Sequence, residues 1–338
     1  MKTALAAAAM ALAATVVAGC GADSATGDAA ITTEVRGTDG FPVSLQNCGM
    51  TVEVPAAPTR AISVNQPATE LLLTLGLADR MVGTASWNDP VAPELAAANA
   101  QVPELSADFP SLETVLEQEP DFIYATFAYT FSGEGIAPRD RFAKLGIPTY
   151  QSSSECTGQD AVQEKALTFD DMYAEITDIS RVFGIEETGE ALVDSLKERV
   201  AGATGGLNAS DATLMYWYSN TRTPYIAGCC GAPGLITESV GAQNAFADSR
   251  QLWPETSWEA ILDRDPDVLV LADLTRGDDG DSAAAKIQFL ENDPLAKQLT
   301  AVREKRYVIL SGTALDPSLR NVDAVETLSS ALRDMGVG

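Results

Sequence analysis

The residue types present limit the chemistry that this chain can perform. Its 338 residues include no histidine, so the usual general base and the commonest transition-metal ligand are both missing. Ser-His-Asp and Cys-His catalysis are therefore excluded. Acidic residues are abundant, but no close acid pair or nucleophile motif supports an enzyme that works with the carboxylates of a cleft. We expect no catalytic residue and no resident cofactor.

Charge and acidic clusters limit the partners. The acidic loop at residues 278–281 lacks the remaining ligands of a calcium loop, so we expect it to be solvated and predict no metal site. The formal net charge of −26 disfavours nucleic acid and an anionic membrane surface as electrostatic partners.

The first cysteine belongs to a targeting segment. Lys2 precedes an apolar, alanine-rich run over residues 4–18, which is typical of a secretory signal. The run ends in Val17-Ala18-Gly19-Cys20, which resembles a bacterial lipobox and implies cleavage before Cys20 and a lipid on its sulfur. We predict a signal peptide at 1–19, a flexible tether at 20–40 and an extracytoplasmic protein anchored to the cell membrane through lipid.

Four further cysteines, Cys48, Cys156, Cys229 and Cys230, allow three pairings in an oxidising compartment. Cys48 and Cys156 both lie in the first half of the chain, which favours a disulfide between them. The adjacent Cys229 and Cys230 could form a vicinal disulfide or stay as thiols, and the sequence leaves both alternatives open.

A motif that occurs twice in the sequence indicates how the folded part of the chain is organised. Residues 111–125 (SLETVLEQEPDFIYA) and 257–271 (SWEAILDRDPDVLVL) share a serine, an acid two residues later, a leucine and an acid-Pro-Asp sequence before an apolar run. The serine can cap a short helix, and Glu113 and Glu259 fall in its first turn, where the helix dipole favours negative charge. The apolar runs suit strands buried on both faces of a parallel sheet.

The duplication predicts two α/β lobes, at residues 41–165 and 207–338. Helix and strand patterns alternate throughout each lobe, which is typical of a parallel sheet. Between them, residues 166–206 predict a helical linker. Thr168 and Asp171 resemble a capping box, Gly184 suits a helix end, and a second helix is expected at 187–200.

These features resemble one known family. Residues 60–65 (RAISVN), 68–72 (ATELL) and 75–83 (LGLADRMVG) look like the opening of ABC-transporter substrate-binding proteins for iron siderophores, haem and cobalamin, the class III periplasmic binding proteins. The similarity continues through 111–113 (SLE), 120–121 (PD), 144–148 (KLGIP), 253–254 (WP), 257–259 (SWE) and 265–267 (DPD), and covers about residues 58–332. It implies a monomer with two Rossmann-like lobes joined by one long helix, here 187–200, and with ligand in the cleft between the lobes.

The resemblance also implies roles for individual residues. Glu113 and Glu259 would dock onto arginines of a permease dimer; alternatively, each complements only its own helix N-terminus. Ligands of open α/β sheets lie beyond the carboxyl ends of the strands. The predicted cleft residues are Asn65, Trp87, Thr126, Phe127, Tyr129, Trp217, Tyr218, Arg222, Trp253 and Arg276.

The predicted ligand is a metal chelate, and a ferric siderophore is favoured. Arg222, Arg276 and Arg139 could pair with an anionic ferric chelate or form solvent-exposed ion pairs instead. Cobalamin and haem are alternatives, haem because tyrosine can be an axial ligand. An extracytoplasmic enzyme using cleft carboxylates and a receptor for bare metal ions are further alternatives, and the lack of histidine counts against the latter.

Overall fold

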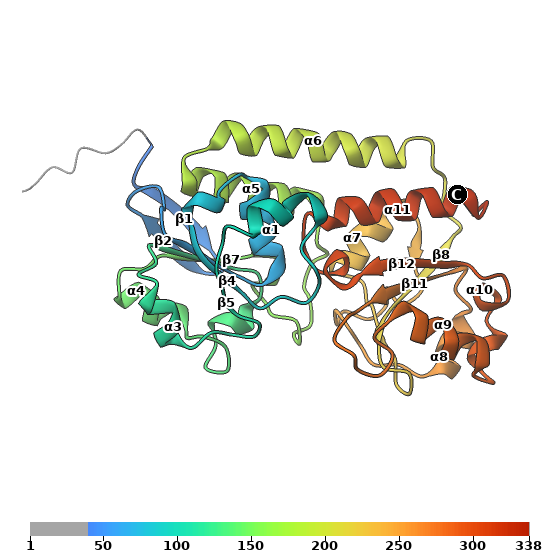
Figure 1. The fold of residues 1–338 in the computed structure, drawn as a ribbon. Helices are drawn as coiled ribbons and strands as arrows, with labels where there is room; N and C mark the ends of the chain where they lie inside the picture. The colour runs from blue at the N-terminus through green and yellow to red at the C-terminus, as the bar shows by residue number, and fades with distance from the viewer. Residues whose placement is uncertain (1–39, 338) are drawn as a thin grey trace, which may run out of the picture. The chain divides into compact units, whose positions relative to one another are not determined.

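A computed structural model describes residues 40–337, which fall within one compact unit of the chain (Figure 1). The first lobe is built on a parallel five-stranded sheet of order β5-β4-β3-β6-β7. Its strands are β3 (Ala61–Val64), β4 (Met81–Ala85), β5 (Glu104–Ser106), β6 (Phe122–Ala125) and β7 (Thr149–Gln151). An antiparallel hairpin, β1 (Val43–Asn47) and β2 (Met50–Val54), precedes this sheet.

The second lobe has its own sheet, of order β10-β8-β11-β12, with β9 antiparallel to β8 and the other pairs parallel. Its strands are β8 (Thr213–Ser219), β9 (Tyr225–Ile226), β10 (Gln243–Asn244), β11 (Val268–Asp273) and β12 (Tyr307–Ser311). The predicted α/β fold with two parallel sheets is confirmed.

Helices cover both faces of each sheet. In the first lobe, α1 (Gln66–Thr74) and α5 (Phe169–Phe183) pack on one face, and α3 (Leu112–Glu117) and α4 (Arg139–Lys144) on the other. In the second lobe, α7 (Ala232–Ser239) and α11 (Arg320–Asp334) oppose α8 (Trp258–Arg264), α9 (Ala283–Asn292) and α10 (Thr300–Arg303). Shorter elements are α2 (Ala96–Asn99) and the 3-10 helices Ala78–Arg80, Pro93–Leu95, Ala128–Phe131, Ser153–Glu155, Ala296–Gln298 and Gly312–Leu315.

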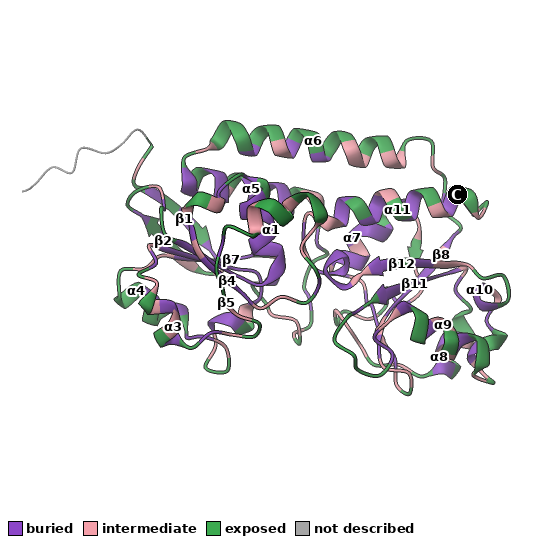
Figure 2. Ribbon diagram, in the orientation of Figure 1, coloured by how far each residue is buried: buried purple, intermediate pink, exposed green. Residues whose placement is uncertain are grey.

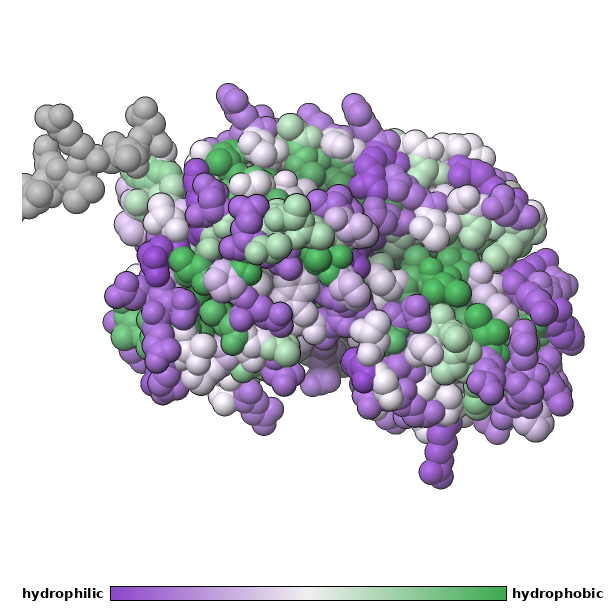
Figure 3. Space-filling view, in the orientation of Figure 1, coloured by the Kyte–Doolittle hydropathy of each residue, from purple (hydrophilic) through white to green (hydrophobic). Residues whose placement is uncertain are grey.

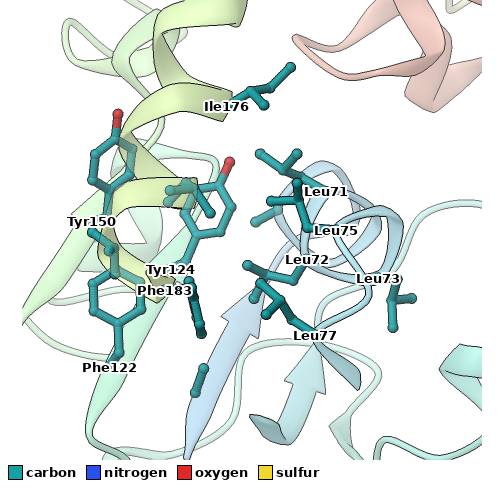
Figure 4. Packing of buried hydrophobic residues seen from close by; sticks show 14 of the residues in the cluster. Leu71, Leu72, Leu73, Leu75, Leu77, Phe122, Tyr124, Tyr150, Ile176 and Phe183 are labelled. Carbon is teal, nitrogen blue, oxygen red and sulfur yellow. The ribbon is translucent and has the colours of Figure 1, made fainter. Parts of the chain in front are cut away.

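The core follows from this two-sided covering. Every residue of β3 and β6 is buried, as the continuous apolar runs predict (Figure 2). Leu71 and Leu72 of α1 face Tyr124 and Phe183 in the cluster between the sheet and its helices (Figure 4). On the face of the molecule shown in Figure 3, hydrophilic and hydrophobic residues are interspersed. No helix of residues 40–337 is long and apolar enough to cross a membrane.

The long helix α6 (Glu186–Thr204) connects the lobes and contacts both α5 and α11 (Figure 1). Arg199 of α6 pairs with Asp323 and Glu326 of α11 at 2.5 and 2.7 Å. The capping box of Thr168 and Asp171 opens α5, and Gly184 ends it in the left-handed conformation, both as predicted. The lobe boundaries stay predictions, because the segment before residue 165 also reaches the second lobe, where Gln163 bonds to Arg250.

Candidate functional site

A cavity of about 260 Å³ is lined by residues of both lobes. From the first lobe it takes the segment after β7, which includes Glu155 and Cys156, and from the second lobe the start of α7, Trp253 and Asp316. This position lies beyond the carboxyl ends of the strands, where open α/β sheets bind ligands. The cavity is therefore the candidate binding site.

A second hollow, of about 420 Å³, adjoins the cavity, because Trp253 lines both. Tyr218 and Arg276 also line this hollow. The rings of Tyr218 and Trp253 lie 4.7 Å apart, and the Arg276 guanidinium lies 5.3 Å from the Tyr218 ring centre. The structure thus brings Tyr218, Trp253 and Arg276 together, and their role in ligand binding stays a prediction.

Two predicted residues organise the first-lobe loops. Asn65 is buried with φ of 74°, and its side-chain oxygen accepts hydrogen bonds from the Phe127 backbone at 3.3 Å and the Thr130 hydroxyl at 2.9 Å. Thr126 is also buried, and its hydroxyl oxygen accepts from the Ala68 N–H at the start of α1. Both side chains form hydrogen bonds within the first lobe, and neither lines the cavity.

Three predicted aromatic residues lie outside the lining of both cavities. Phe127 is buried and stacks on Tyr129, with ring centres 5.2 Å apart, while Tyr129 is 41% exposed. Trp87 is half-buried, and its Nε1 donor is buried without a hydrogen-bond partner in residues 40–337. Of these three residues, Tyr129 is the most exposed.

Two predictions need correction. Trp217 is 0% exposed and packs against Trp258 and Phe289 in the core beneath β8, so a ligand-facing role is not supported. Arg139 is buried and donates to the Thr149 hydroxyl and carbonyl and to the Asn47 carbonyl. It ties β7 to the hairpin and does not reach the cleft.

The other two predicted arginines, Arg222 and Arg276, lie in different surroundings, and their roles stay predictions. Arg276 is ion-paired with Asp281 at 2.7 Å, which matches the alternative of a partly exposed ion pair. Arg222 lies on an exposed turn and lines neither cavity. In residues 40–337 no group of three Cys, Asp or Glu side chains could hold a metal ion.

Sequence reasoning missed two buried acids in the cavity lining. Glu155 is 2% exposed, and burial together with the charge of Asp316 raises the pKa of its carboxyl to about 8. Asp316 is 6% exposed, and burial followed by the charge of Asp89 raises its pKa to about 7. Glu155 could have been suspected from its place beside Cys156, whereas no sequence signal marks Asp316.

The cysteine pairing favoured from the sequence is present. A disulfide joins Cys48 to Cys156, which fixes the loop carrying Glu155 to the end of the β1–β2 hairpin. Cys229 and Cys230 are bonded to each other, and Cys230 lines the cavity. Cys20 and the predicted signal peptide lie outside the described residues, as does the tether before residue 40.

The repeated acids occupy equivalent places in the two lobes. Ser111 caps α3 by accepting from the Thr114 N–H at 3.1 Å, and Ser257 caps α8 by accepting from the Ala260 N–H at 3.2 Å. Glu113 and Glu259 are exposed in the first turns of these helices. Both helices cover the sheet faces opposite those that carry α5 and α11, and hence opposite α6.

Buried polar contacts join the lobes beside the cavity. Asp89 accepts from the Thr313 N–H and hydroxyl, both at 2.7 Å. Arg320 of α11 donates through Nε to Glu70 of α1 at 2.8 Å, and their side chains are 14% and 3% exposed. The two lobes therefore contact each other directly as well as through α6.

The chain resembles known proteins over most of its length. A family model described as "Periplasmic binding protein" matches residues 62–313. The chain belongs to this family. This periplasmic binding protein is 25% identical to a vitamin B12-binding protein of Vibrio cholerae, over 82% of this chain and 91% of the relative.

Solved structures resemble this periplasmic binding protein in fold and sequence. A periplasmic binding protein from Veillonella parvula aligns with a TM-score of 0.76 and 25% identity, over 86% of this chain and 97% of the other. An ABC-type Fe3+-hydroxamate transport system protein from Saccharomonospora viridis aligns with a TM-score of 0.70 and 27% identity, over 86% and 99%. The family predicted from the sequence is thus confirmed.

Proposed function

We propose that this periplasmic binding protein captures a ferric siderophore between its lobes and delivers it to the permease of an ABC importer. The observation that carries the proposal is the cavity lined by both lobes, with Trp253 in its wall. The Fe3+-hydroxamate transport protein of similar fold supports an iron chelate as ligand.

Delivery to a permease requires the protein to lie outside the cytoplasm. In this proposal, lipid on Cys20 holds the protein to the membrane. Docking would use Glu113 and Glu259, which present one exposed carboxylate per lobe on faces opposite α6. A pair of equivalent acids suits a permease with two equivalent halves.

Cobalamin is the second candidate ligand, because vitamin B12-binding proteins are among the curated relatives that match over most of this chain. A carboxylate-based enzyme is less well supported, because these relatives are named as binding proteins. We therefore expect binding without turnover.

The test is a titration of the purified protein with a ferric trihydroxamate, cyanocobalamin and haemin, followed by tryptophan fluorescence and calorimetry. We expect saturable quenching by the ferric chelate with a Kd of about 1 μM or lower. Trp253→Phe should remove most of the quenching, and Trp87→Phe, which alters an indole outside the cavity lining, serves as the comparison. Saturation by cyanocobalamin alone would select the second candidate, and no saturation by any probe would contradict the proposed class of function.

A further inference from the structure

The charged residues of the cavity lining are mostly acidic. Four acids contribute to it, and the one cationic side chain among the lining residues is Lys165. Lys165 is 78% exposed and already pairs with Asp171 at 2.6 Å. In the adjoining hollow, Arg276 is paired with Asp281 in the same way. The acids of the cavity lining are Glu155, Glu164, Asp171 and Asp316.

Two of these acids, one from each lobe, are buried residues with carboxyl oxygens that have no protein partner within residues 40–337. The Oε2 atom of Glu155 is buried and has no hydrogen-bond partner in the described chain. No hydrogen bond reaches the side-chain oxygens of Asp316 within residues 40–337, although its backbone is bonded to Thr313 and Asn321. A buried carboxyl that lacks a partner destabilises the fold, so such groups in a cavity indicate a ligand that supplies the missing donor.

The surroundings of the two acids favour a cation as that donor. Trp253 lines the same cavity as both acids, and its ring lies 4.7 Å from that of Tyr218 in the adjoining hollow. Aromatic faces beside carboxylates attract cations, and the attraction grows where water is excluded.

We infer that the cavity selects a ferric chelate without net negative charge, and that Glu155 and Asp316 together receive an ammonium group of that chelate. The inference rests on the proposed function and adds the class of ligand. It also reverses the prediction of an anionic chelate bound by arginines, because Arg139 and Arg276 are occupied within the protein.

Binding of a cation should depend on pH. After the larger effect of burial, the charges of Asp316 and Glu175 raise the pKa of Glu155, while Asp89 raises and Arg276 lowers the pKa of Asp316. Since the neighbouring acids and burial keep the two carboxyls partly protonated near neutral pH, an ammonium ligand must displace protons to bind. Its affinity should therefore fall as pH drops from about 8 to about 6, and a neutral chelate should show a weaker dependence.

The experiment compares three iron chelates by calorimetry at pH 7.5. Ferrioxamine B carries a free ammonium group on a neutral trihydroxamate centre, its N-acetyl derivative lacks that charge, and a ferric tris-catecholate carries three negative charges. We expect ferrioxamine B to bind about tenfold tighter than the acetylated chelate and the catecholate to bind at least about a hundredfold more weakly.

Isosteric variants assign the effect to the two carboxyls. Glu155→Gln and Asp316→Asn should reduce the preference for the ammonium chelate to about twofold while leaving affinity for the acetylated chelate nearly unchanged. Glu190→Gln, which neutralises an exposed acid of α6 outside both cavities, should keep the wild-type preference. Thermal unfolding of each variant confirms that it is folded.

The outcomes separate the inference from the proposed function. Tighter binding of the catecholate, equal binding of the two hydroxamates, or an unchanged preference in Glu155→Gln and Asp316→Asn would overturn the inference while the protein still bound iron chelates. Absence of binding for all three chelates would instead overturn the proposed function together with the inference.

Discussion

The Glu155 carboxyl shows how one residue can couple ligand binding to stability. It sits in the 3-10 helix directly after β7, where the adjoining Cys48–Cys156 disulfide holds the loop in place. Its backbone carbonyl accepts from the Gln151 side chain, which further fixes the position, but the buried Oε2 atom has no partner. The protein therefore holds an acid in a site where its ionised form is disfavoured.

The free energy of unfolding of the ligand-free protein should depend on pH because of the raised pKa of Glu155. Glutamate ionises near pH 4.5 in the unfolded chain, whereas burial raises the pKa of Glu155 to about 8 in the folded protein. Between these values the folded state holds a proton that the unfolded state has released, so the free energy of unfolding falls as pH rises. This residue should contribute a fall of about 1 kcal/mol per pH unit between pH 5 and 8, which Glu155→Gln removes.

Denaturant unfolding at several pH values measures the effect. Glu164→Gln is the matched control, because that side chain is exposed and its loss should leave the wild-type slope unchanged. Parallel slopes for wild type and Glu155→Gln would show that the carboxyl is not held protonated in the folded protein.

At the scale of elements, the helices α3 and α8 repeat one construction in two lobes. Each begins with a serine cap, carries an exposed glutamate in its first turn and precedes a buried strand. The cap and the helix dipole explain why an acid is tolerated there, but they do not require the side chain to be Glu in both copies.

Charge reversal tests the docking role of these helices. Glu113→Lys together with Glu259→Lys should reduce ligand uptake by an importer in vesicles about tenfold or more, because the two proposed ion pairs with the permease would become repulsions, while ligand Kd changes by less than about twofold. The control pair Glu117→Lys and Asp263→Lys reverses exposed acids later in the same helices and should leave uptake near normal. Equal losses in both pairs would indicate a general charge effect instead of specific docking.

The sequence predicts elements well where the signal is local. The apolar runs of β6 and β11, the Thr168 capping box and the Gly184 helix end all match the structure. The start of α7 lacks such a signal, because its first turn contains Pro233 and is preceded by two cysteines and a glycine.

The site was harder to predict because it depends on contacts between distant segments. Successive side chains of a strand point to opposite faces, so Trp217 and Tyr218 of β8 could not both reach the cleft. Tyr218 reaches the adjoining hollow and Trp217 enters the core. Glu155 and Asp316 line one cavity only because the two lobes bring them together, and their positions in the sequence do not predict this proximity.

For the whole molecule, the join between the lobes depends on a buried ion pair as well as on α6. Glu70 and Arg320 come from α1 and α11, and the Thr313 contacts to Asp89 lie beside them. A buried pair is a weak source of net stability, yet removal of one partner leaves an uncompensated charge.

Arg320→Met should therefore lower the free energy of unfolding by about 3 kcal/mol, and the double change Glu70→Gln with Arg320→Met should recover at least about half of that loss. Denaturant unfolding measures both. Arg303→Met, at an exposed site in α10, should change stability by less than about 0.5 kcal/mol. No recovery in the double variant would show that packing of the Arg320 stem matters more than the charge left on Glu70.

The direct contacts between α1 and α11 have a consequence for sensor engineering. Two fluorophores, one attached to each lobe, would change their separation little on ligand capture if these contacts persist, so energy transfer between them would be a poor signal. An environment-sensitive dye placed near Trp253, where the proposed ligand would displace water, is the better design.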